Sequence, residues 1–158
     1  MAAITVVSYG GITVRANNSA SQNAANTANK KSNVYATEAT TTGKYPATLA
    51  ILTDPASSAL TYHLDGVTYG AMGTDTTTAI PPLTPAAPAS KSSILYAICG
   101  VRVANNNAIP LATADIVTIT GNKIYYWNWS ASAITTTPIV NGIYQGSVGS
   151  QAVGCFAA

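Results

Sequence analysis

The sequence has few charged residues. Asp, Glu, Lys and Arg make up 8% of its 158 positions, against about 25% in an average soluble domain. The formal net charge is +2, and the basic residues do not cluster, which argues against a nucleic-acid-binding surface. Thr, Ser, Asn, Ala and Gly must therefore cover most of the surface, a composition that is common in proteins working outside the cell.

The residue types that carry catalysis and metal binding are also scarce. The chain has five acidic residues and one histidine, and it shows no Gly-rich phosphate-binding loop. His63 and Asp65 are two positions apart, a spacing that shares one face of a strand but does not make a Ser–His–Asp triad. We expect His63 to be an ordinary surface or loop residue, with metal binding by His63, Asp65 and Asp75 as the alternative. The composition favours a protein that is not an enzyme and uses no cofactor.

The two cysteines, Cys99 and Cys155, fit no zinc or redox motif, because the sequence contains no CxxC pair. In a Thr-rich chain with little charge they favour one structural disulfide, formed in an oxidising compartment. On the chain-entropy model, closing a loop of this length stabilises a fold by roughly 4 kcal/mol. Two unpaired buried thiols are the alternative.

A hydrophobic run long enough to cross a bilayer is missing too. The apolar start, Ala2 to Val7, is far shorter than the roughly 20 residues that a membrane-spanning helix needs. It also lacks the basic segment that opens a signal peptide. Because the composition indicates export, we expect that the natural N-terminus has been removed and that Met1 was added to restart translation.

The first 42 residues show helical periodicity. Residues 2–42 contain no proline, and the pair Gly10-Gly11 costs a helix only about 1 kcal/mol per Gly relative to Ala. Small side chains recur every four positions and suggest a stripe on one helix face: Ala16, Ala20, Ala24 and Ala28. We predict one helix over residues 2–41, softened at the glycine pair, whose stripe packs against the protein's own sheet. Gly43 is expected to cap its end.

The remaining chain changes character twice. Residues 43–92 are punctuated by prolines, and we expect a short helical turn over 45–52 and a hairpin around Asp65-Gly66. Strand patterns follow over 94–103, 116–120, 124–130, 139–145 and 152–156, with residues 121–123 as a three-residue turn. This order predicts an α+β fold in which the long helix packs on an antiparallel meander. The predicted organisation is one domain with three regions: 1–42, 43–92 and 93–158.

Three aromatic residues share one face of the predicted strand 124–130: Tyr125, Trp127 and Trp129. We expect this face to pack on the helix as core, because large aromatic side chains usually dominate buried area. An exposed platform for a glycan or a surface is the alternative.

Three basic residues lie on the predicted helix: Arg15, Lys30 and Lys31. We expect them to belong to a solvated helix face. Charge pairing between subunits and weak attraction to DNA are the alternatives.

The ordered features of the first 52 residues resemble those of type IV pilins. Ala2 to Tyr9 is similar to the end of that family's apolar N-terminal segment, and residues 15–35 to the Ala-rich amphipathic helix that follows it. Gly43-Lys44-Tyr45-Pro46, with a Leu-rich stretch over 49–52, resembles the turn at which the family's chain leaves the helix. The second half resembles a pilin head, with one cysteine in the first strand and one near the C-terminus bounding the family's disulfide region. The family's cleavable leader, its acidic residue near the mature N-terminus and most of its membrane-spanning half-helix have no counterpart here, so the sequence resembles the soluble part of a pilin.

The resemblance implies a pilin fold and a role as a structural subunit, most directly a major pilin, of a type IV pilus filament. Assembly would use the helix that carries the following residues: Ile4, Val7, Tyr9, Ala16, Ala20, Ala24 and Ala28. The implied partners are other copies of the chain, the pilus assembly machinery in the membrane, and host or abiotic surfaces, with DNA as a further candidate. The implied location is the cell surface, after membrane anchoring, and the implied roles are adhesion, twitching motility or DNA uptake. A minor pilin or pseudopilin of a secretion or competence system, and an extracellular glycan-binding module, are the alternatives.

Overall fold

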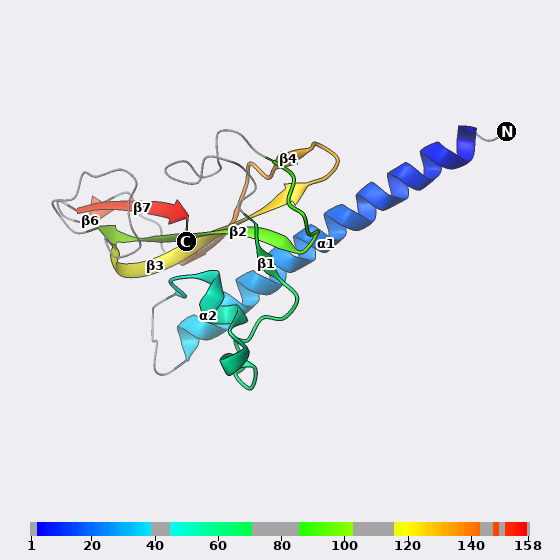
Figure 1. Cartoon of the computed structure of the whole chain (residues 1–158). Helices are drawn as coiled ribbons and strands as arrows, with labels where there is room; N and C mark the ends of the chain where they lie inside the picture. The colour runs from blue at the N-terminus through cyan, green and yellow to red at the C-terminus, as the bar shows by residue number, and fades with distance from the viewer. Residues whose placement is uncertain are drawn as a thin grey trace.

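One long helix lies along a mixed β-sheet (Figure 1). The computed structural model describes residues 3–38, 45–70, 86–102, 116–142, 147–148 and 151–157. The helical elements are α1 (Ala3–Thr37), α2 (Leu49–Thr53) and the 3-10 turn η1 (Pro55–Ser57). The strands are β1 (Thr68–Tyr69), β2 (Ser93–Arg102), β3 (Ile116–Asn128), β4 (Ala133–Ile134), β5 (Ile139–Gly142), β6 (Ser147–Val148) and β7 (Gln151–Ala157). The predicted α+β class is confirmed.

The order of the strands differs from the predicted meander. It is β4-β3-β2-β7-β6, with β1 also paired to β2 and β5 to β3. The β1–β2 pair is parallel, whereas the others are antiparallel. The expectation of an antiparallel meander is therefore wrong in two respects. The sheet is mixed, and the chain passes from β5, beside β3, to β6 and β7 on the other side of β2.

Helix α1 is continuous over 35 residues, and the softening expected at Gly10-Gly11 is not seen. Its last turn is closed by Thr37 Oγ1, which donates to Val34 O (2.8 Å), and by the N–H of Glu38. These bonds satisfy carbonyl groups that a helix end leaves without partners. The helix thus ends four residues before the predicted position, and the expected cap Gly43 lies outside the described residues.

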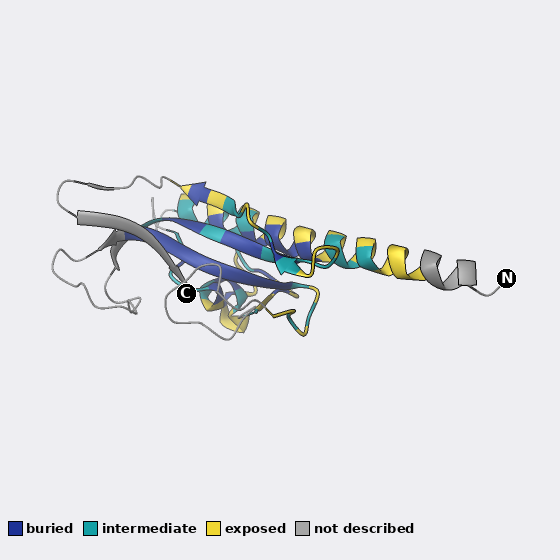
Figure 2. Ribbon diagram, turned by 90° about the horizontal axis from the view of Figure 1, so that it is seen from above, coloured by how far each residue is buried: buried dark blue, intermediate teal, exposed yellow. Residues whose placement is uncertain are grey.

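Small side chains let α1 lie close to the sheet. The buried ones follow each other at helical spacing: Ser21, Ala24, Ala25, Ala28 and Ser32. Figure 2 shows buried positions on the side of α1 that faces the strands and exposed positions on the outer side. The predicted stripe is right for Ala24 and Ala28 but wrong for Ala16 and Ala20, which are exposed. With 3.6 residues per turn, a series at every fourth position drifts by about 40° per step, so the stripe leaves the buried side.

The main core lies between α1 and the sheet. Alternate residues of β2 and a residue of β3 meet the small side chains of α1, and α2 and the segment after it close one end. The buried residues contributed by these strands and segments are Leu49, Leu52, Leu64, Val67, Ile94, Tyr96, Ile98 and Ile124. The helical turn expected over 45–52 is present as α2, but it begins later than predicted, at Leu49.

Residues 121–123 do not form the predicted three-residue turn. They lie inside β3, which is one strand of 13 residues. Cys99 pairs with Gly121 and Gly100 with Ile119, so Thr120 is an extra residue that forms a β-bulge. A Cβ on Gly121 would lie 2.3 Å from the carbonyl oxygen of Asn141. The glycine therefore marks a close approach between β3 and β5, not a chain reversal.

The hairpin expected around Asp65-Gly66 is also absent. Gly66 has a positive φ of 71° and turns the chain into β1, which pairs in parallel with the start of β2. The segment before it does not form a strand, because the N–H of Leu64 donates to Leu52 O (2.8 Å) and holds it against α2. Gly66 thus lies in a turn, as predicted for Asp65-Gly66. The turn leads from a coil into the parallel strand β1 and does not connect two strands of a hairpin.

A group of buried hydrogen bonds joins α1 to the sheet. Asn122 Nδ2 donates to Ser32 Oγ (2.8 Å) and to Tyr96 Oη (3.0 Å). Asn122 Oδ1 accepts a hydrogen bond from Asn141 Nδ2 (3.0 Å), and Tyr96 Oη donates to Pro46 O (3.0 Å). All the side chains in this group are buried, where an unpaired polar group would be costly. We call Ser32, Tyr96, Asn122 and Asn141 the polar network.

The polar network continues toward the surface through Asn33. Asn33 Nδ2 donates to Asn141 Oδ1 (2.9 Å), and Asn33 Oδ1 lies 3.4 Å from Tyr45 Oη. The neighbouring Asn29 differs, because its Oδ1 is buried without a hydrogen-bond partner among the described residues. The side chain of Asn33 therefore has hydrogen-bond partners, whereas the side-chain oxygen of Asn29 has none among the described residues.

We expect Asn122→Ala to lower the free energy of unfolding by about 2–4 kcal/mol, because it leaves Ser32, Tyr96 and Asn141 with unmet hydrogen bonds. Asn29→Ala is the control, and it should change stability by no more than about 0.5 kcal/mol, since it removes an unpaired oxygen and adds a good helix former. Urea unfolding of both variants measures the difference. Equal losses would mean that the polar network does not stabilise the fold.

Tyr96 makes stability depend on alkaline pH. Burial raises the pKa of its phenol from 10.0 to about 12, and hydrogen bonds from Ser32 and Asn122 oppose this shift only in part. The folded state therefore holds the proton more tightly than the unfolded state, and this stabilisation is lost as the pH rises from about 10 to about 12, by about 2–3 kcal/mol in all. Urea unfolding between about pH 9 and about pH 11.5 should show a steeper decline for the wild type than for Tyr96→Phe. Parallel declines would contradict the assignment to Tyr96.

Candidate functional site

The N-terminal half of α1 extends beyond the sheet (Figures 1 and 2). Among the described residues, hydrogen bonds between α1 and the rest of the chain begin at Asn18. Tyr9 is 71% exposed and Ile12 is 64% exposed. Ile4 and Val7 also belong to α1, but their side chains lie outside the description. We call residues 3–17 the free half of α1.

The exposed apolar side chains that are described in this region share one side of the helix with Ala20, which lies just after it. At 100° per residue, Tyr9, Ile12, Ala16 and Ala20 fall within about 80° of its circumference. Ser21 and Ala25, which face the sheet, lie on a different side. The outer side of α1 therefore presents an apolar stripe with small residues, which suits close packing against another helix. We call these four residues the outer stripe.

Side chains just after the free half join α1 to the turn that follows β3 and to the segment before β2. Asn18 Oδ1 accepts a hydrogen bond from the N–H of Trp129 (2.7 Å), and Asn18 Nδ2 donates to Ser130 Oγ (2.7 Å). Trp129 Nε1 donates to Ser21 Oγ (2.8 Å), which in turn donates to Lys91 O (2.8 Å). Sequence patterns did not identify this anchor, because nothing in the spacing of Asn18 and Trp129 signals that they meet.

Two of the three predicted aromatic residues, Tyr125 and Trp127, lie in β3 and are fully packed. Tyr125 and Trp127 are buried, at 5% and 4% exposure, in a second cluster with Leu95 and Ile134. This cluster lies on the face opposite to α1, because the alternate residue Ile124 packs in the core beneath the helix. Packing of the aromatic face on the helix was therefore a wrong expectation, although burial was the right one for these two residues.

Trp129 lies just beyond the strand and packs, partly buried, against the second cluster. β3 ends at Asn128, whose Oδ1 accepts hydrogen bonds from the N–H groups of Ser130 and Ala131 and starts a turn. The turn brings the Trp129 indole to Ser21 on α1. A flat platform of three exposed aromatic rings, as a glycan-binding surface requires, is not what these residues form.

We expect Trp127→Ala to destabilise the fold by about 3–5 kcal/mol, because it removes a large side chain from a packed cluster. Tyr9→Ala, which shortens an exposed aromatic residue, should leave the melting temperature within the error of measurement. Thermal unfolding followed by circular dichroism compares the two variants. A Trp127→Ala protein with wild-type stability would show that the second cluster contributes little.

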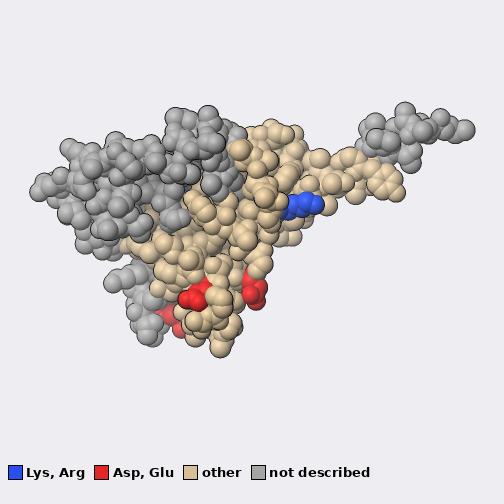
Figure 3. Space-filling model, in the orientation of Figure 1, with Lys and Arg blue, Asp and Glu red and all other residues tan. Residues whose placement is uncertain are grey.

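Few charges mark the surface. On the face shown in Figure 3, acidic side chains lie around α2 and the segment after it, while basic atoms are visible at one small place over α1. Arg15 and Lys30 are exposed, and Lys31 Nζ donates to Thr61 O (2.6 Å). Lys31 therefore helps to hold the loop after η1 against α1. The expectation that it belongs to a solvated helix face was wrong for this residue.

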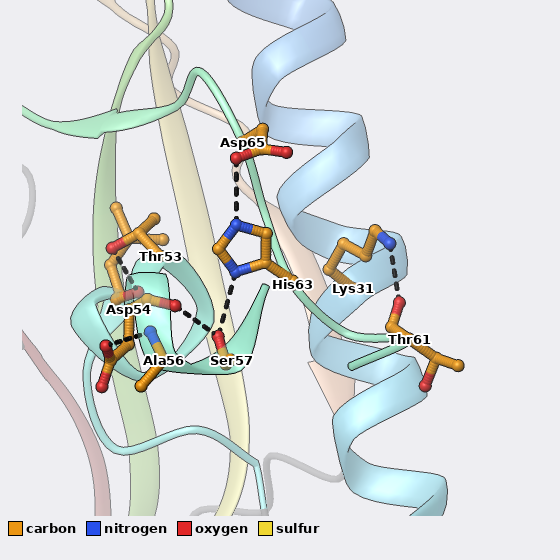
Figure 4. A network of polar contacts seen from close by, with 9 residues as sticks. Lys31, Thr53, Asp54, Ala56, Ser57, Thr61, His63 and Asp65 are labelled. Atoms are coloured by element: carbon orange, nitrogen blue, oxygen red, sulfur yellow. Dashed lines mark hydrogen bonds and ion pairs between the residues drawn. The ribbon is translucent and has the colours of Figure 1, made fainter. Parts of the chain in front are cut away.

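Ser57, His63 and Asp65 form a hydrogen-bonded series (Figure 4). Ser57 Oγ lies 2.9 Å from His63 Nδ1, and His63 Nε2 lies 2.9 Å from Asp65 Oδ1. Ser57 Oγ also donates to Asp54 O (2.7 Å), and Asp54 Oδ1 accepts from the N–H of Ala56 (2.8 Å). His63 lies in a loop, as expected, but its contacts with Asp65 and Ser57 were not predicted from the sequence.

This series differs from a catalytic triad in how its members are exposed. In a serine hydrolase the carboxylate is buried and the hydroxyl faces the substrate. Here the Ser57 residue is 6% exposed and the Asp65 side chain is 94% exposed. The serine also contacts Nδ1 and the carboxylate contacts Nε2, the reverse of the usual arrangement. The geometry fits a structural role, in which these hydrogen bonds fix the conformation of residues 54–65.

A metal site is not found in the described part of the chain. The residues described there contain no group of three or more His, Cys, Asp or Glu side chains able to hold an ion. His63 and Asp65 are in contact with each other, whereas Asp75, the third residue proposed with them, lies outside the described residues.

The two cysteines lie opposite each other on neighbouring strands. Cys99 of β2 is the Cα partner of Cys155 of β7, and opposite residues of antiparallel strands are close enough for a disulfide. Cys99 is disulfide-bonded and fully buried, and Cys155 is the chain's other cysteine. Such a bond fastens β7 to the middle of the sheet.

None of the described helices is both long and apolar enough to span a membrane. Among known proteins, no family model matches the chain, and no curated protein or solved structure is significantly similar to it.

Proposed function

We propose that this chain is a structural subunit of a type IV pilus filament, displayed at the cell surface. The observation that carries the proposal is the free half of α1, a helix that extends beyond its own sheet with Tyr9 and Ile12 exposed. A monomeric domain gains nothing by exposing large apolar side chains on an isolated helix, because burying each CH₂ group contributes about 0.8 kcal/mol. A partner that covers the outer stripe would bury these side chains and gain this free energy.

Other copies of the chain are the partners that fit the outer stripe best. The stripe combines large residues with Ala16 and Ala20, so that a second helix can approach closely. Within residues 9–23 of α1 the one charged side chain is that of Arg15, so bundling of several copies brings few like charges together. The parts of the chains that follow α1, from Tyr45 onward, would then form the outer surface of the filament, and we call this part the head.

The head has properties that suit a filament surface. α1 is held to it by small residues and by the polar network, and a disulfide-bonded cysteine joins β2 and β7. The low charge and the Thr, Ser and Asn content limit repulsion between neighbouring heads. The work of such a subunit is assembly, so that adhesion, twitching motility or DNA uptake would depend on the filament and on machinery in the membrane, and not on a catalytic site in this chain.

The proposal predicts that Ile12→Asp abolishes filament formation while leaving the head intact. The natural gene is expressed in cells that carry pilus assembly machinery, and fibres sheared from the surface are examined by electron microscopy and immunoblotting. We expect the wild-type chain in these fibres and at least about a tenfold reduction for Ile12→Asp, because a charge on the outer stripe must be desolvated when helices pack.

Gln22→Asp is the matched control, since it adds the same charge at an exposed position on a different side of the same helix. It should leave the amount of fibre within about twofold of wild type. Melting temperatures of the purified proteins confirm that both heads are folded. Absence of the wild-type chain from surface fibres would overturn the proposal, and equal effects of the two variants would remove the outer stripe from it.

A further inference from the structure

The chain contains a single Asn-Gly pair, Asn141-Gly142, at the end of β5. Asn-Gly is the sequence most prone to spontaneous deamidation, because glycine has no side chain to hinder attack by its backbone nitrogen on the preceding amide. In the fold Asn141 hydrogen-bonds with Asn33 of α1 and with Asn122 of β3, so the labile pair lies where β5 meets the helix and the neighbouring strand. Its position raises the question of what keeps the amide intact.

The amide of Asn141 is held on both sides. The residue is 7% exposed, and its Nδ2 donates to Asn122 Oδ1 (3.0 Å) and lies 3.4 Å from Asn29 O. Its Oδ1 accepts from Asn33 Nδ2 (2.9 Å). Attack by the Gly142 nitrogen requires the side chain to rotate back over its own backbone, and these bonds oppose that rotation.

The glycine is required by the fold as well. Gly142 has a φ of 76°, a conformation that residues with a side chain rarely adopt. A Cβ at this position would lie 2.1 Å from Thr120 O and 2.7 Å from the Cα of Gly121. Both members of the labile pair therefore have structural roles, and neither can be exchanged without cost.

We propose that Asn141 is a deamidation site that the folded head keeps closed and that unfolding opens. In the opened chain the Gly142 nitrogen attacks Cγ of Asn141, the bond to the amide nitrogen breaks, and ammonia leaves with the proton from the backbone nitrogen. Water then opens the cyclic imide to give aspartate or isoaspartate. No enzyme or oxidant is needed.

The product does not fit the polar network. A carboxylate at position 141 has no hydrogen to donate, yet it would face Asn122 Oδ1 and Asn29 O, which are both acceptors. Asn33 Nδ2 would still donate to one carboxylate oxygen, but the other oxygen would face two acceptors, and burying an ionised group in this arrangement is far more costly than burying the amide. A chain that stays unfolded for long is therefore marked chemically and does not return to the native head.

The first test compares deamidation rates in the folded and unfolded protein. The full chain is incubated at mildly alkaline pH in native buffer and in concentrated urea, and peptide mapping by mass spectrometry follows the conversion at Asn141. We expect conversion to be at least about tenfold slower in the native protein, since it must pass through an opened state. Asn18, which precedes a serine, is the internal reference. Equal rates at Asn141 in the two conditions would overturn the proposal.

The second test asks whether the product is excluded from the fold. Protein aged in urea is refolded, and we expect chains converted at Asn141 to be depleted at least about fivefold from the refolded fraction relative to the starting mixture. Asn141→Asp should likewise unfold at a lower urea concentration than wild type, whereas Asn23→Asp, which adds the same charge at an exposed position of α1, should not. Equal recovery of converted and intact chains, or wild-type behaviour of Asn141→Asp, would show that the carboxylate is accommodated.

Discussion

Small side chains on α1 allow its backbone to approach the sheet closely enough for Ser32 and Asn122 to share a hydrogen bond. A larger residue at Ala25 or Ala28 would push the helix away and separate these partners, since both alanines are fully buried. The position of the segment after the helix depends on the same contact, because Tyr96 donates to Pro46 O. Gly121 and Gly142 extend this close packing to β5, where backbones approach each other directly.

The sequence predicts the elements of this fold better than their connections. Helical periodicity located α1, and strand patterns located β2 and β7, because each signal depends on a run of neighbouring residues. The bulge at Thr120 and the parallel pair β1–β2 depend on contacts between distant segments. Glycine was misleading for the same reason, since Gly121 marks a close approach in space and not a turn in the chain.

The sequence also predicted single candidate functional residues better than the contacts that those residues make. The outer stripe follows from the residue spacing only when the true helical repeat of 3.6 is used, because a repeat of four assigns Ala16 and Ala24 to one face. The burial of Trp127 followed from its size, but the face on which it packs depends on strand register, which a single sequence does not reveal. Ser57 approaches His63 through a coil without periodicity, so no pattern could have joined them.

The place of β7 in the sheet sets the order in which the molecule can form. β7 comes last among the described strands, yet it pairs with β2, near the centre of the strand order. A ribosome that has released only the first two thirds of this chain has produced α1 and β2 but not the strand that covers one edge of β2. That edge stays open until the rest of the chain emerges, and sheets closed by such non-local pairs form slowly. The head is therefore complete only after β7 has been made, and until then it is most exposed to proteases and to wrong strand pairing.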